Sequence, residues 1–86
     1  MPSKSVTVGS SVGLHARPAA IISEAAGELD VEVTLAVPGE EPVDASSSLL
    51  IMTLGAKYGD TVEVAGDDPG DVDSIAALVE QDLDAD

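Results

Sequence analysis

One histidine could do chemistry here, because His15 is the only histidine among the 86 residues. It lies in the segment GLHARPA (residues 13–19), where a glycine precedes it and Arg17 and Pro18 follow it. An imidazole is largely neutral near neutral pH, and the neutral ring has a lone pair available for nucleophilic attack. His15 can therefore accept a phosphoryl group without help from a second side chain that acts as a base.

The residues after His15 favour an anion site at the start of a helix. Proline is tolerated in the first helical turn, so Pro18 predicts that a helix begins near Ala16. The first backbone N–H groups of a helix have no partner within the helix and bind anions readily. We expect the N–H groups of Ala16 and Arg17, together with the Arg17 guanidinium, to stabilise a phosphoryl group on His15. The alternative is that His15 is an ordinary surface or capping residue.

Charge is unevenly distributed along the chain. The sequence has 17 acidic and three basic residues, which gives a formal net charge of -14. No acidic residue precedes Glu24, and none occurs in residues 45–59. Either these two windows form the core and cannot hold carboxylates, or they form a face kept free of negative charge for phosphate and partner proteins. Nucleic acid is an unfavourable partner, because the acidic chain would repel a polyanion.

The composition resembles that of proteins from salt-loving archaea, with many carboxylates, few basic residues and 1% aromatic residues. At molar salt the Debye length falls to about 3 Å, so repulsion between the carboxylates is screened. We therefore expect folding to require high salt, which circular dichroism in dilute buffer tests. The apolar residues, 44% of the total, fall in periodic segments, which is typical of a folded chain rather than a disordered acidic one.

The length fits a single domain over residues 1–86. The absence of cysteine excludes disulfides and thiolate metal sites. The acid-rich segment 67–73 does not match a calcium loop, because Leu78 stands where the loop needs glutamate, so it is interpreted as a turn and helix cap. No apolar run approaches the roughly 20 residues of a membrane span. We expect a cytoplasmic monomer with no metal, no cofactor and no membrane insertion.

The spacing of apolar residues predicts seven elements of secondary structure. Strands alternate polar and apolar residues, and helices repeat apolar residues every three or four positions. The predicted strands are residues 5–8, 31–37, 43–45 and 61–65, and the predicted helices are residues 16–26, 49–54 and 71–83. The order β-α-β-β-α-β-α predicts an α+β two-layer open-faced sandwich, a four-stranded antiparallel sheet with three helices on one face. The helix at 49–54 is apolar almost all round, so it must be buried or meet a partner.

The GLHARPA motif resembles the active-site signature of the histidine-containing phosphocarrier (HPr) family of the phosphoenolpyruvate sugar phosphotransferase system. The order of elements and the segment SSLLIMTLG (residues 47–55) are also similar to that family, so the resemblance covers essentially the whole chain. It implies that His15 accepts a phosphoryl group at Nδ1 from phosphorylated enzyme I and passes it to the A domain of a sugar-specific enzyme II. Arg17 would steady the phosphoryl group. Such a protein is a carrier rather than a free-standing enzyme.

The resemblance also implies a docking surface, formed by the start of the first helix and the short second helix. Leu49, Leu50 and Met52 are then candidate partner contacts. The family's regulatory serine would fall on Ser47. We favour a simpler role for Ser47 as a helix N-cap, because Ser46 stands where family members usually carry a basic residue. Lysines are scarce around this surface, so the partners are expected to match a less basic face.

The sequence leaves three alternatives to a sugar phosphocarrier. The chain could feed a dihydroxyacetone kinase system, or it could be a regulatory module that does not transfer phosphate, although the presence of both His15 and Arg17 argues against the second. A free-standing enzyme with His15 as general base is disfavoured. The sequence shows no nucleophilic constellation, and so small a domain leaves little room for a substrate pocket.

Overall fold

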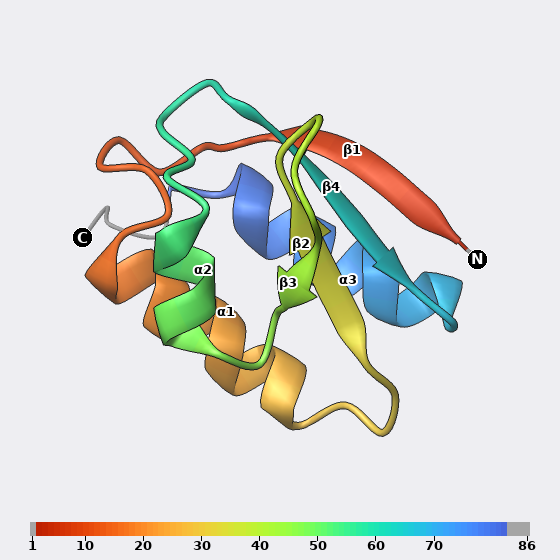
Figure 1. The fold of residues 1–86 in the computed structure, drawn as a ribbon. Coiled ribbons are helices and arrows are strands. Elements are labelled where there is room, and N and C mark those ends of the chain that lie inside the picture. The colour runs from red at the N-terminus through yellow and green to blue at the C-terminus, as the bar shows by residue number, and fades with distance from the viewer. Residues whose placement is uncertain (1, 83–86) are drawn as a thin grey trace.

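Residues 2–82 are described by a computed structural model, and over this range the chain forms one four-stranded sheet and three helices (Figure 1). The sheet order is β1-β4-β2-β3, and every pair of neighbouring strands is antiparallel. The elements are β1 Ser3–Thr7, α1 Ala16–Gly27, β2 Val33–Ala36, β3 Val43–Asp44, α2 Ser48–Thr53, β4 Thr61–Gly66 and α3 Pro69–Glu80. The predicted fold class and the predicted order of elements are confirmed.

The ends of several elements differ from the prediction. The strand predicted over 31–37 is shorter, because β2 pairs with β4 only from Val33 to Ala36 and the Val37 carbonyl already accepts a turn hydrogen bond from the Glu40 N–H (3.0 Å). Helix α3 begins earlier than predicted, at Pro69, because the Asp68 side chain caps it by accepting from the Gly70 N–H (2.8 Å). The predicted end of this helix at residue 83 lies outside the described residues.

The core lies between the sheet and the helices. One face of the sheet contributes alternate side chains, as the period of two predicts. The helices contribute residues spaced three or four apart. Fully or almost fully buried side chains include Val33, Leu35, Val62 and Val64 from the sheet and Ile22, Ile51, Ile75 and Val79 from the helices. All three helices thus bury apolar side chains, and of the described helices none is long and apolar enough to cross a membrane.

Candidate functional site

His15 is the N-cap residue of α1, with an extended backbone (φ -97°, ψ -161°). Its carbonyl oxygen accepts the first helical hydrogen bond from the Ala19 N–H (2.8 Å). Its side chain is exposed and makes no capping hydrogen bond. The backbone of His15 therefore starts the helix, while the imidazole is left accessible to a reagent from solution. His15 thus stands at the capping position of α1 but does not cap the helix through its side chain.

The first turn of α1 provides positive potential beside His15. Ala19 is the first residue whose N–H bonds within the helix, and Pro18 has no N–H. The N–H groups of Ala16 and Arg17 therefore belong to the helix end, where the partial charge is positive. The Arg17 side chain is exposed, and the first turn holds no acidic residue. An anion bound to His15 would meet dipoles and a cation without a competing carboxylate in that turn.

The loop before His15 is held against the segment that follows α2. The Leu14 N–H donates to the Ala56 carbonyl (3.0 Å), and the Leu14 side chain is buried. Gly13 has a positive φ of 77°, and a Cβ at this position would lie 2.6 Å from the Ala56 oxygen. Only glycine therefore suits this close approach. The motif contains Gly13, but nothing in the sequence pattern pairs residue 13 with residue 56, so this contact could not be predicted.

The beginning of the same loop is held by the end of α3. The Gly9 N–H donates to the Val79 carbonyl (3.0 Å), and a Cβ on Gly9 would overlap the carbonyl oxygen of Glu80. Ser10 is fully buried, and its hydroxyl donates to the Gln81 carbonyl (3.1 Å). Gly9 and Ser10 thus help to position the loop that leads to His15. A buried serine has no signal in the hydropathy pattern.

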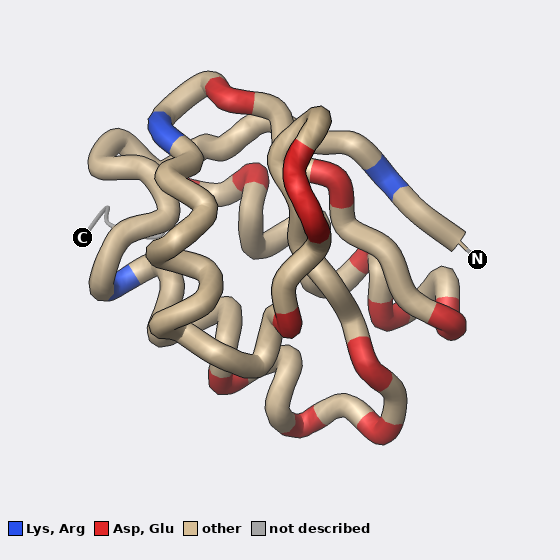
Figure 2. The backbone as a smooth tube through the Cα atoms, viewed as in Figure 1, with Lys and Arg blue, Asp and Glu red and all other residues tan. Residues whose placement is uncertain are grey.

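The two acid-free windows are brought together in the fold. Helices α1 and α2 pack against one another, and the Leu14–Ala56 hydrogen bond joins the loops beside them. Figure 2 shows the acidic residues elsewhere, around the sheet, α3 and the turn after α1, while α2 and the start of α1 carry none. Each window also contributes buried side chains, including Leu14 and Ile51. The core interpretation therefore holds for the inner sides of the windows. Their outer sides form a face whose own residues carry no carboxylate, and the neighbouring Asp60 and Asp82 carboxylates accept from the Lys57 and Ser11 N–H groups at its edge (2.9 and 3.4 Å).

Large apolar side chains are exposed on this face. Leu49 is 70% exposed and Leu50 is 41% exposed, whereas Met52 is partly buried and packs against the core. Val12 and Tyr58 are also exposed, by 53% and 67%. Neither residue is among the predicted partner contacts, although Tyr58 is the only aromatic residue and lies in an acid-free window.

The hydroxyl groups before α2 serve local structure. The Ser47 Oγ accepts from the Leu50 N–H (3.3 Å), so Ser47 is the N-cap of α2. The Ser46 N–H and hydroxyl both donate to the Asp44 carboxylate (2.9 and 2.7 Å). These bonds hold the pKa of Asp44 below its usual value, because they stabilise the charged form. The capping role of Ser47 is thus observed directly.

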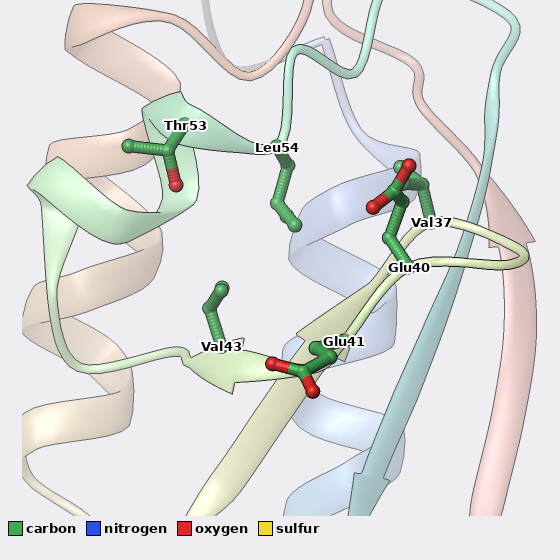
Figure 3. A pocket seen from close by; sticks show the side chains of 6 residues that line it. All are labelled: Val37, Glu40, Glu41, Val43, Thr53 and Leu54. Carbon is green, nitrogen blue, oxygen red and sulfur yellow. The ribbon is translucent and has the colours of Figure 1, made fainter.

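A hollow of about 550 Å³ lies away from His15, between the β2–β3 hairpin and the end of α2. Figure 3 shows the side chains that line it, Val37, Glu40, Glu41, Val43, Thr53 and Leu54. Two carboxylates at one hollow disfavour a phosphate ligand there. Within residues 2–82, no three histidine or acidic side chains are grouped so that they could hold a metal ion.

An exposed histidine at a helix start, on an open-faced sandwich, is the arrangement of a histidine phosphocarrier. The family model described as "PTS HPr component phosphorylation site" matches residues 2–81, and the chain belongs to the HPr family. It is similar to the phosphocarrier protein HPr of Streptomyces coelicolor, with 40% identity over 86 residues, 96% of this chain and 92% of that protein. It is also similar to the phosphocarrier protein NPr of Shewanella violacea, with 36% identity over 84 residues, 94% and 91% of the two chains.

The fold comparison agrees with the sequence comparison. The crystal structure of the phosphocarrier protein HPr from Bacillus anthracis superposes with a TM-score of 0.83 and 27% identity, covering 91% of this chain and 95% of that one. The chain is therefore a phosphocarrier of the phosphotransferase system rather than a free-standing enzyme.

Proposed function

We propose that His15 accepts a phosphoryl group from phosphorylated enzyme I and passes it to the A domain of a sugar-specific enzyme II. The observation that carries this proposal is the exposed imidazole at the start of α1, whose side chain takes no part in capping. The same site would serve a carrier for the A domain of a dihydroxyacetone kinase system. Assays with each kind of A domain identify the acceptor.

The transfer needs few groups from this chain. The lone pair of His15 Nδ1 attacks phosphorus, and the bond between phosphorus and the donor breaks with its electron pair leaving on the donor. The new dianionic group then lies at the positive end of α1, near the N–H groups of Ala16 and Arg17 and the Arg17 guanidinium. Because His15 and Arg17 are exposed, this stabilisation stays modest in water. A carrier requires that balance, since it must release the group to the next protein.

The proposed docking surface is the acid-free face around His15. Leu49 and Leu50 are exposed on α2, with Met52 partly exposed beside them, so they are the proposed partner contacts. We place the protein in the cytoplasm, as a monomer with no nucleic-acid partner. We also propose that it works at molar salt, because every described acidic side chain is exposed or partly exposed and its charge needs screening.

Incubation with phosphoenolpyruvate and the cognate enzyme I, in molar salt, tests the proposal. The expected product is a single phosphate that is lost in acid and stable in base, detected by mass measurement of the intact chain. An unchanged mass in the presence of an active enzyme I would contradict the proposed function.

Replacing Arg17 by alanine is expected to slow phosphoryl uptake about tenfold without unfolding the protein. The guanidinium is worth about 1–2 kcal/mol to an exposed dianion, which corresponds to roughly that factor in rate. The measurement is the initial rate of labelling from phosphorylated enzyme I.

Lys4→Ala is the matched control, because it removes one exposed positive charge from β1, outside the α1–α2 face. This control should be labelled at the wild-type rate. Equal rates for Arg17→Ala and Lys4→Ala would show that the end of α1 is sufficient without the guanidinium.

A further inference from the structure

The exposed apolar side chains are not scattered over the protein. The large hydrophobic residues exposed within residues 2–82 are Val12, Leu49, Leu50 and Tyr58. Single exposed apolar residues are ordinary on a protein surface and need no explanation. Here all four fall in the two acid-free windows, although those windows make up less than half of the chain. The exposed apolar residues therefore occur in the parts of the chain that lack acidic residues.

Val12 and Tyr58 lie on two loops that run side by side. The Val8 N–H donates to the Asp60 carbonyl (2.9 Å), and the Leu14 N–H donates to the Ala56 carbonyl (3.0 Å), so the loops are antiparallel. Between these bonds, a Cβ at Gly13 would lie 3.0 Å from the Lys57 Cα. Val12 and Tyr58 are the next residues beyond that contact, one on each loop.

We infer that Val12 and Tyr58 form a second apolar contact for the phosphoryl donor protein, separate from the leucines of α2. We call these two residues the loop patch. This inference rests on the proposed function of His15, and it adds two loop residues to the proposed partner contacts Leu49, Leu50 and Met52. It implies that the donor protein has an apolar recess, poor in charged side chains, that binds the Tyr58 ring.

The reach of the chain limits the distance between the loop patch and His15. A stable interface buries about 800 Å² on each partner, a disc of roughly 16 Å radius. The Cα of Val12 lies three residues from that of His15, hence within about 11 Å. The path from the His15 Cα along the chain to Gly13, across the contact to Lys57 and on to the Tyr58 Cα is roughly 16 Å long. The His15 and Tyr58 Cα atoms therefore lie no farther apart than roughly 16 Å. Both Cα atoms therefore lie within the radius of an interface of this size centred on His15.

The chemistry of the loop patch suits a protein partner. Tyrosine is enriched among the residues that dominate binding at interfaces, because its ring buries a large area at a small cost in side-chain entropy. Lys57 precedes Tyr58, and its N–H donates to the Asp60 carboxylate (2.9 Å), which fixes the turn that carries Tyr58. The ring is thus presented from a hydrogen-bonded turn rather than from a free chain end.

Kinetics with the cognate enzyme I test the contribution of the ring. Tyr58→Ser is expected to raise the KM for this protein about tenfold with little change in kcat, because it removes binding and leaves His15 unchanged. Tyr58→Phe should restore the wild-type KM, since the ring remains. Val12→Thr should raise the KM about threefold, and Val31→Thr, the same change at the half-buried turn after α1, should leave it unchanged.

Fluorine NMR provides a direct readout of contact. With one tyrosine in the chain, 3-fluorotyrosine labelling gives a single resonance from Tyr58. Titration with unphosphorylated enzyme I should shift or broaden that resonance.

The experiments distinguish failure of the loop patch from failure of the proposed phosphocarrier function. A wild-type protein that is phosphorylated, with normal KM values for Tyr58→Ser and Val12→Thr and an unchanged fluorine resonance, would overturn the loop patch alone. A wild-type protein that enzyme I does not phosphorylate would overturn both.

Discussion

His15→Ala is expected to take up no phosphate from phosphoenolpyruvate and enzyme I. The chain has no second histidine, and its serine and threonine hydroxyls are weak nucleophiles unless a base removes their proton, whereas a neutral imidazole needs no base. The loss should be complete within the sensitivity of a mass measurement, rather than a partial decrease in rate.

The fold of the His15→Ala variant should remain intact, which makes the result interpretable. The His15 side chain is exposed and makes no capping hydrogen bond, while the backbone bond from Ala19 to residue 15 is kept. The free energy of unfolding should therefore change by less than about 0.5 kcal/mol. Phosphate retained in this variant would show that the acceptor is another residue.

Gly13→Ala is expected to destabilise the loop that carries His15 and to slow phosphoryl uptake. The added Cβ stands on a residue with positive φ, which costs about 1–2 kcal/mol of folding free energy. It also lies 2.6 Å from the Ala56 oxygen, so the two loops must move apart at a further cost of about 1–3 kcal/mol. Displacing the loop also moves His15 away from its position at the helix start. We expect the rate of phosphoryl uptake to fall by about 10²-fold, because transfer depends on the alignment of the reacting atoms.

Gly39→Ala is the matched control for Gly13→Ala. Gly39 also has a positive φ, of 86°, but a Cβ there meets nothing within 4 Å. This variant should lose only about 1–2 kcal/mol and should be labelled at the wild-type rate. Chemical denaturation in high salt gives the two free energies. Equal destabilisation of the two variants would show that the contact with Ala56 does not hold the loop.

Periodicity predicted most of the fold because it reports burial. The alternation of Val62 and Val64 with polar residues predicted β4, and the spacing of Ile75 and Val79 predicted α3, since both patterns follow the side that faces the core. Local signals were equally informative. Pro18 predicted the start of α1, and Ser47 predicted the cap of α2, because both effects act within one turn.

The parts of the site that the sequence did not predict depend on contacts between distant segments. The approach of Gly13 to Ala56 and the bond from Ser10 to Gln81 join residues more than 40 positions apart. A single sequence carries no periodic signal for such pairs. The exposure of Val12 and Tyr58 was missed for a related reason, because an apolar residue in a loop can point inward or outward and only the packing decides.

The account depends on a phosphoryl group that His15 both receives and gives up. The most direct test is to purify the phosphorylated protein and mix it, in molar salt, with a stoichiometric amount of unphosphorylated enzyme I and no phosphoenolpyruvate. We predict that the phosphate returns to enzyme I within minutes, because the exposed site at the start of α1 stabilises it only modestly. Phosphate that stays on His15, or that is released only to water, would contradict the role of this protein as a carrier.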